Sequence, residues 1–218
     1  MEGKRISIIH PSRWRHKMAK QAHDHWMSLA DDPKSIEYIL SLDTSDNTFI
    51  DYQEAFINDD IDTMVCPNRS IVDAVNNAAK NAQGDIFVVV SDDFEAFQGW
   101  DTVIIERLDI KRAELLHTFD TIQNNVCTLP ILTKKYFELF GHIYHPHYIS
   151  MFADDDMTEC AKLVNGYVEA FDLTFAHNHW VNGKNPKDKT YDRENSKTAW
   201  EVGKRMFQQR KARRFDLA

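Results

Sequence analysis

Residues 84–93, with the sequence GDIFVVVSDD, combine a continuous apolar run with an abrupt polar end. The run at 86–90 is rich in β-branched residues, which predicts a central strand that is covered on both faces. Ser91, Asp92 and Asp93 follow it directly, so a hydroxyl and two carboxylates stand where this strand ends. We therefore expect a buried strand with a polar site at its carboxyl end.

The segments before this strand alternate between strand and helix patterns. The strands are expected over residues 6–9, 36–42 and 61–65, and the helices over 18–30 and 70–82. Ser70 is expected to cap the second helix together with Asp73, and Gly84 to end it. Such alternation predicts an α/β fold with a central, mostly parallel sheet flanked by helices.

The second half of the chain is less regular. We expect strands over 103–108, 115–119 and 171–180, and helices over 134–140, 156–165 and 196–213. The length of 218 residues suits one domain. The prediction is a single domain over 1–195, followed by a basic C-terminal helix over 196–218.

Composition excludes several classes of protein. Hydrophobic residues make up 43% of the chain, enough for a core, and no apolar run approaches the length of a membrane span. The three cysteines form no CxxC pair, and the apolar run at 6–9 is too short for a signal peptide, so we expect a cytoplasmic protein. Neither GxGxxG nor GxxxxGKS/T occurs, which disfavours a dinucleotide-binding enzyme and a Walker NTPase.

Polar residues follow each predicted parallel strand, where such sheets bind their ligands. The candidate binding residues from these clusters are Pro11, Ser12, Arg13, Asp43, Asn68, Arg69, Ser91 and Asp92. Adjacent carboxylates such as Asp92 and Asp93 repel each other unless a cation or hydrogen-bond donors hold them, and a divalent ion with a nucleotide diphosphate is a common occupant. The alternative is a solvated turn.

Five segments together resemble the family 2 glycosyltransferases, which have the Rossmann-related GT-A fold. They are ISIIHPS at 6–12, IEYILSLDTSD at 36–46, NRS at 68–70 before a helix, GDIFVVVSDD at 84–93 and FADDD at 152–156. The resemblance covers most of residues 5–180 in order, and it implies that 1–195 form the catalytic domain. It further implies a metal-dependent enzyme that moves a sugar from a nucleotide diphosphate sugar to an acceptor hydroxyl, with inversion at the anomeric carbon.

Individual roles follow from the resemblance by position. Pro11, Ser12 and Asp43 fall where the family contacts the nucleoside, with the Asp43 carboxylate accepting from the base. Asp92 and Asp93 fall on the family's DxD-like motif, where one carboxylate meets the ribose and the last binds Mn²⁺ or Mg²⁺. The motif here reads Ser-Asp-Asp, which favours Asp93 as the metal ligand.

The acidic run at 154–156 opens a predicted helix, where acidic residues commonly serve as caps. The resemblance instead implies that its second acid, Asp155, is the general base, with Asp154 as the other candidate. Proton abstraction requires that the carboxylate reach the acceptor hydroxyl.

A histidine pair and a lysine complete the candidate site. His177 and His179 lie on one face of a predicted strand, so both can approach one ion; the alternative is a pair of surface histidines. The resemblance implies a late metal ligand in this region. Lys184 in the next loop is a candidate for closing over the diphosphate, against a merely solvated lysine. The histidines at 142, 145 and 147 are interpreted as an acceptor-side loop.

The net charge of −8 is uneven, because residues 197–218 hold seven basic and two acidic side chains. A solvated helix is the simplest interpretation. The alternative is an anionic acceptor, such as a phosphorylated glycan, a lipid headgroup or DNA, since clustered Lys and Arg bind phosphate. A phage-type enzyme that decorates modified DNA bases, acting in the host cytoplasm, is one form of this hypothesis.

Two other functions stay open at this point. A nucleotidyltransferase of related architecture also uses carboxylate-bound Mg²⁺, but it usually carries a Gly-rich phosphate loop, and residues 10–13 are not one. A non-catalytic module would keep the fold and hold nucleic acid with the basic C-terminal helix.

Overall fold

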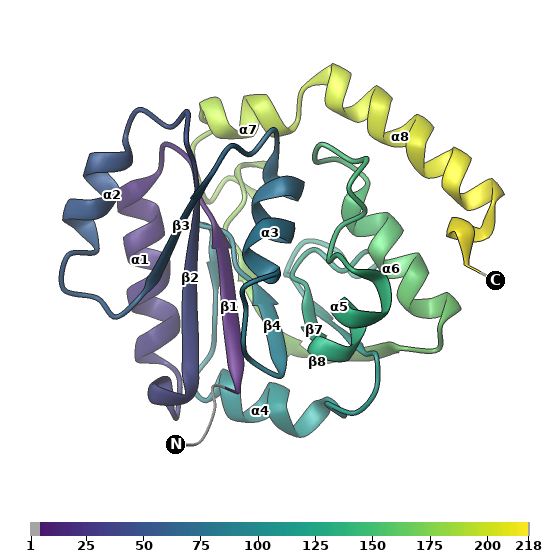
Figure 1. Ribbon diagram of the computed structural model, residues 1–218, viewed down its shortest axis with the longest axis horizontal. Coiled ribbons are helices and arrows are strands. Elements are labelled where there is room, and N and C mark those ends of the chain that lie inside the picture. Colours follow the sequence, from purple (N-terminus) through teal and green to yellow (C-terminus); the bar gives the residue numbers. More distant parts are fainter. Residues whose placement is uncertain (1–4, 218) are drawn as a thin grey trace.

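In the computed structural model, which describes residues 5–217, a seven-stranded sheet lies between two layers of helices (Figure 1). The strands, in spatial order, are β3 (Asp62–Cys66), β2 (Ile36–Asp43), β1 (Ile6–Pro11), β4 (Ile86–Val89), β7 (Ile131–Thr133), β6 (Leu115–Phe119) and β8 (Tyr167–Thr174). Within this sheet, as described for residues 5–217, only the pairings of β7 with β4 and β6 are antiparallel. The predicted α/β fold with a mostly parallel sheet is confirmed.

Alternate strand residues point to opposite faces and build two cores. On one face, Ile9 and Val89 pack with α3 (Ile71–Ala79), α5 (Lys134–Phe140) and α6 (Ala153–Leu163). On the other, Ile8 and Val88 pack with α1 (His16–Ser28) and α4 (Trp100–Arg107). The helix α2 (Phe49–Ala55) packs on α1 through a smaller cluster. Among residues 5–217, no helix is long and apolar enough to cross a membrane.

The start of α3 confirms the predicted cap, but its end does not follow the prediction. The Ser70 hydroxyl accepts from the Asp73 amide at 3.3 Å. The helix ends at Ala79, so Gly84 does not terminate it. Gly84 is instead required because its backbone passes against β1: a Cβ atom there would lie 2.6 Å from the Ser7 amide nitrogen.

Several predicted elements of the second half are corrected. Residues 103–107 belong to α4 rather than to a strand, and Leu108 follows the helix. Trp100 and Ile104, one helical turn apart, both bury against the sheet. The strand expected over 171–180 begins at Tyr167, ends at Thr174 and is followed by β9 (Ala176–His177), which pairs with β5 (Phe94–Glu95) in a separate two-stranded sheet. The helix expected from 156 begins at Ala153. Neither α2 nor β7 was predicted.

The basic C-terminal segment forms α8 (Lys197–Ala212), which packs on α6. Arg210 is buried, and its Nε donates to Asp156 Oδ2 at 2.6 Å. The Tyr148 hydroxyl donates to the same oxygen at 3.0 Å. At the other end of the contact, Gly203 lies so close to the Met151 carbonyl that a Cβ atom would approach it to 2.3 Å. One face of α8 is therefore fixed to the domain.

We expect Arg210→Ala to lower the free energy of unfolding by about 3 kcal/mol or more, because it leaves the buried Asp156 carboxylate without its cation. Urea denaturation monitored by circular dichroism measures the loss. Arg213→Ala, which breaks only an exposed pair with Asp216, is the matched control and should cost under about 1 kcal/mol. Equal losses in the two variants would contradict a stabilising role for the buried pair.

Candidate active site

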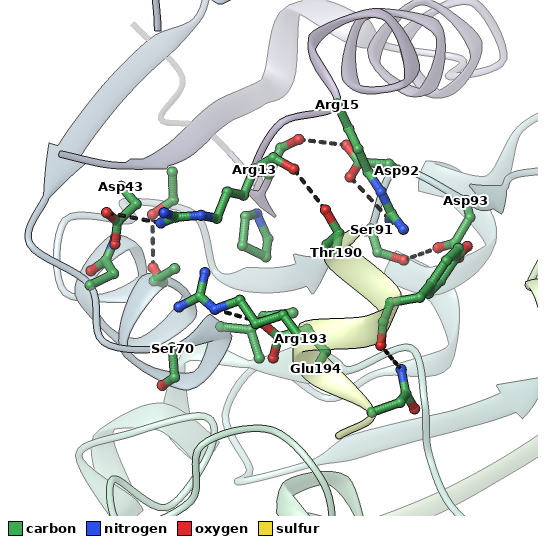
Figure 2. Close-up of a pocket in the computed structure, with 18 of the residues that line it drawn as sticks. Arg13, Arg15, Asp43, Ser70, Ser91, Asp92, Asp93, Thr190, Arg193 and Glu194 are labelled. Carbon is green, nitrogen blue, oxygen red and sulfur yellow. Dashed lines mark hydrogen bonds and ion pairs between the residues drawn. The ribbon is translucent and has the colours of Figure 1, made fainter. Parts of the chain in front are cut away.

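A cavity of about 220 Å³ opens at the carboxyl ends of β1, β2 and β4 (Figure 2). It brings together ten of the residues singled out from the sequence, which are Pro11, Ser12, Arg13, Asp43, Asn68, Ser91, Asp92, Asp93, His177 and His179. Four others, Arg69, Lys184, Asp154 and Asp155, do not line it. The residues that the sequence placed after four separate strands, together with the late histidines, thus meet in one site.

Asp43 marks one end of the cavity. Its Oδ1 accepts from the Ser45 amide at 2.7 Å and lies 3.0 Å from Arg13 Nη1. Burial acts to raise the pKa of Asp43, but the donors from Ser45 and Arg13 outweigh it and hold the pKa below its ordinary value. Asp43 therefore presents an ionised carboxylate, an acceptor for N–H groups, at this end of the cavity.

Asp92 is fixed by side chains from the end of β1 and the loop after it. Its Oδ1 lies 3.0 Å from His10 Nε2 and accepts from the Ser12 hydroxyl at 2.7 Å. His10 is fully buried, and its Nδ1 lies 2.6 Å from the Tyr38 hydroxyl oxygen. A buried chain from Tyr38 through His10 therefore orients Asp92. The sequence singled out 10–13 as a polar cluster, but it carried no signal for the contact with Tyr38.

Asp93, one residue further, faces the late part of the chain. Its Oδ2 accepts from the Tyr191 hydroxyl at 2.6 Å and lies 3.4 Å from His177 Nε2. Burial acts to raise the pKa of Asp93, but the interactions with His177, Ser91 and Tyr191 outweigh it and hold the pKa well below its ordinary value. The register of β5 with β9, which places Phe94 opposite His177, brings the histidine to this carboxylate.

The side-chain atoms around Asp93 suit the binding of a divalent cation. A carboxylate oxygen and an imidazole nitrogen are ligands that Mn²⁺ accepts, and His177 Nδ1 is buried without a hydrogen-bond partner among the described residues. His179 lies beside them, with its ring centroid 5.0 Å from that of His177. The three side chains do not form a closed triad, because the only such cluster within residues 5–217 is His23, Asp24 and Asp59. Asp93 and His177 are therefore the pair that fits a metal.

A short helix that the sequence did not predict covers the cavity. α7 (Lys189–Glu194) contributes Thr190, Tyr191, Arg193 and Glu194 to the lining, and Figure 2 shows it crossing between Asp43 and Asp93. Its N-cap residue Asp188 forms a paired contact with Arg15, a further cavity residue missed from the sequence. Six residues are too few to show an amphipathic pattern, and only the cap at Asp188 was a usable signal.

The acidic run lies apart from this lining, at the amino end of α6. Asp156 is engaged by Arg210, which leaves Asp154 and Asp155 as the candidate bases. Burial and the neighbouring Asp155 charge raise the pKa of Asp154 to about 7. Burial also raises the pKa of Asp155, although a hydrogen bond from Asp154 opposes this. The two carboxyl groups therefore behave as a pair that shares a proton near neutral pH.

Arg69 and Lys184, two of the predicted binding residues, lie at the surface. The Arg69 side chain is 77% exposed and pairs with Asp73, while its backbone carbonyl accepts from Arg193 of α7. Lys184 is exposed in the loop before α7. The rings of the histidines at 142, 145 and 147 contact one another in sequence, but no three ligand atoms there converge as a metal site requires.

Solved structures with the same fold include S. aureus TarS, a mannosyltransferase and glucosyl-3-phosphoglycerate synthase. S. aureus TarS 1–349 in complex with UDP has a TM-score of 0.64 and 15% identity, covering 79% of this chain and 60% of that chain. Mannosyltransferase PcManGT from Pyrobaculum calidifontis, in complex with GDP-Man and Mn²⁺, has a TM-score of 0.62 and 12% identity, with 97% and 76% covered. The chain spans less than two thirds of the TarS structure.

A third similar structure is glucosyl-3-phosphoglycerate synthase from Mycobacterium tuberculosis, in complex with Mn²⁺, UDP and glucosyl-3-phosphoglycerate. It has a TM-score of 0.56 and 11% identity, with 80% of this chain and 72% of that chain covered. These neighbours confirm the GT-A fold. No curated protein sequence matches. The model of glycosyl transferase family 2, however, matches residues 7–128, more than half of the chain, with β1 to β4 and the cavity residues that follow them. The chain belongs to glycosyl transferase family 2.

Proposed function

We propose that this chain transfers a sugar from a nucleotide diphosphate sugar to an acceptor hydroxyl, with Mn²⁺ or Mg²⁺ as cofactor. One observation carries the proposal: the ends of three adjacent strands and the late His177 meet in a single cavity, with Asp43 at one end and the Asp93–His177 pair at the other. This separation suits a ligand with a base at one end and a diphosphate at the other. The solved neighbours contain UDP or GDP-Man.

The donor would lie along this cavity. The base would meet the ionised Asp43, with Pro11, Ser12 and Asn68 around the nucleoside, and the ribose would meet Asp92. A cation bound by Asp93 and His177 would offset the negative charge that develops on the departing nucleotide. Because His10 and Ser12 fix Asp92 before any ligand arrives, little ordering of this carboxylate is needed.

We propose Asp155 as the general base of an inverting transfer. A protonated Asp154 donates to Asp155 when the pair holds one proton, which keeps Asp155 ionised and able to accept the acceptor's proton. The position of both residues at the start of α6 follows the family's acidic motif.

The acceptor is proposed to be anionic. Lys204, Arg205 and Lys211 on α8, and Arg214 just after it, are exposed and form no ion pair with any residue in the described part of the chain. α8 packs on α6, the helix that carries Asp154 and Asp155. Phosphate groups of a glycan, a lipid headgroup or DNA would match this charge, and we place the reaction in the cytoplasm.

A thermal-shift screen with UDP- and GDP-sugars tests the donor. A ligand that binds only the folded chain, at about 100 times its Kd, stabilises it by about 2.7 kcal/mol and should raise Tm by about 5 °C or more. We expect the rise for at least one nucleotide sugar and only with Mn²⁺ or Mg²⁺ present. The matching nucleoside without phosphates is the control. Equal Tm values across the panel, with and without metal, would contradict the proposal.

A further inference from the structure

Arg15 lies in the donor cavity, where its guanidinium is paired with Asp188, the N-cap residue of α7. Its side chain is 7% exposed and follows β1 on the loop that also carries Ser12 and Arg13. Nε and Nη2 donate to the two carboxylate oxygens of Asp188 at 2.7 and 2.8 Å, a two-pronged contact. Its Nη1 lies 3.6 Å from Asp92 Oδ2, as Figure 2 shows at the upper right of the site.

Arg15 is the cation placed at the diphosphate end. The described residues that line the cavity include three arginines. Arg13 is paired with Asp43 at the opposite end, and Arg193 donates to the Arg69 carbonyl. Only Arg15 stands beside Asp92, next to the metal-binding carboxylate of Asp93. Lys184, the residue that the sequence suggested for this role, does not line the cavity.

The Asp188 carboxylate binds Arg15 in the way that a phosphate group would. A guanidinium donates in parallel to carboxylate and phosphate oxygens alike, so Asp188 offers the contact that a phosphate would. The next turn of α7 repeats this relationship: the Tyr191 hydroxyl donates to Asp93 at 2.6 Å, on the carboxylate proposed to bind the metal. The Tyr191 ring also lies 4.1 Å from the Arg15 guanidinium carbon. Asp188 and Tyr191 therefore bind Arg15 and Asp93, the two side chains proposed to contact the diphosphate and its metal ion.

Apart from Asp188 and Tyr191, a small set of contacts joins α7 to the rest of the domain. The Ser150 hydroxyl donates to the Glu194 carbonyl at 2.6 Å, and Lys189 Nζ lies 4.2 Å from the Trp14 ring centroid. A six-residue helix has no independent stability, and its polar contacts with the domain include Thr190 to the Arg13 carbonyl at 3.1 Å and Arg193 to the Arg69 carbonyl at 2.9 Å. The Asp188 side chain is 33% exposed in its pair with Arg15, so water can hydrate its carboxylate when the pair breaks.

We propose that Arg15 binds the diphosphate of the donor, and that Asp188 and Tyr191 of α7 are exchangeable occupants which the donor displaces. This inference rests on the proposed function, because it takes the ligand to be a nucleoside diphosphate. It makes Asp188 a competitor of the donor for Arg15, so the two partners of one ion pair have opposite effects on affinity.

The test is calorimetric titration of UDP and GDP into the full chain with Mn²⁺. We expect Arg15→Gln to weaken binding by about tenfold or more, because it removes a charged donor to phosphate. Asp188→Asn should tighten binding by about threefold or more, since it removes the competing charge while Asn can still cap α7. Asp192→Asn, on the same helix and paired with Lys187, is the control and should leave affinity unchanged.

The signs of the two affinity changes, compared with the melting temperatures, separate this inference from a purely structural role. Both variants lose the same ion pair, so each should lower the Tm of the ligand-free protein in the same direction, while their effects on affinity have opposite signs. If Arg15 only anchors α7, both substitutions change affinity in the same direction, and the inference is overturned. If the unmodified chain binds neither nucleotide, the proposed function itself fails.

Discussion

Asp93→Asn is expected to abolish metal-dependent sugar transfer, with kcat/KM lower by about 1000-fold or more. The Asp93 carboxylate is buried, held below its ordinary pKa, and positioned 3.4 Å from His177 Nε2. An amide keeps the size of the side chain but loses the charge that attracts the cation. Initial rates with the donor identified by thermal shift, measured over a series of Mn²⁺ concentrations, give the effect.

The matched control is Asp62→Asn, an exposed carboxylate on β3 outside the cavity, which should retain the rate of the unmodified protein. Circular dichroism establishes that each variant folds. Asp93→Asn with undiminished kcat/KM at saturating Mn²⁺ would mean that this carboxylate does not hold the metal.

Asp155→Asn should lower kcat by about 100- to 10,000-fold, the usual contribution of a general base, with a smaller effect on donor affinity. In the unmodified enzyme the base must be ionised, and the pKa of Asp155 is raised above its ordinary value, chiefly by burial. The rate should therefore be present above this raised pKa and fall as pH decreases through it. A pH profile of kcat for both proteins measures the fall in rate at low pH and the lower kcat of the variant.

Comparison with Asp154→Asn distinguishes the two acids. Asparagine at 154 can still donate to Asp155, so kcat should fall by less than about tenfold, and the titration near pH 7 that we expect of Asp154 in the unmodified enzyme should be absent. Glu169→Gln, exposed on β8, is the unaffected control. A large loss in Asp154→Asn with a near-normal Asp155→Asn would reverse the assignment.

The part of the site that the sequence predicted depends on local pattern and on one topological rule. The length and β-branched content of the run at 86–90 favour a buried strand next to polar residues, and the carboxyl ends of parallel strands meet at one edge. Those two facts place Asp43, Asp92 and Asp93 together without any knowledge of side-chain contacts. The cap at Ser70 was readable for the same reason, because it depends on neighbours within one turn.

The part that could not be predicted depends on contacts between distant residues. Arg15 and Asp188 are 173 positions apart, and each lies in a loop without periodicity. The apolar run at 103–105 has no period of its own, so only packing against the sheet decides that it is helical. Within the basic segment, sequence counted Arg210 with the other cations, whereas the structure buries it against Asp156 and leaves its neighbours exposed.

Anomalous diffraction from Mn²⁺, in crystals of the full chain grown with UDP or GDP, tests the central claim most directly. The account predicts a manganese peak bridging the Asp93 carboxylate and the nucleotide diphosphate, with His177 beside it and the Tyr191 hydroxyl moved away from Asp93. A nucleotide bound in the cavity with no manganese at Asp93, or a nucleotide bound outside the cavity between Asp43 and Asp93, would contradict it.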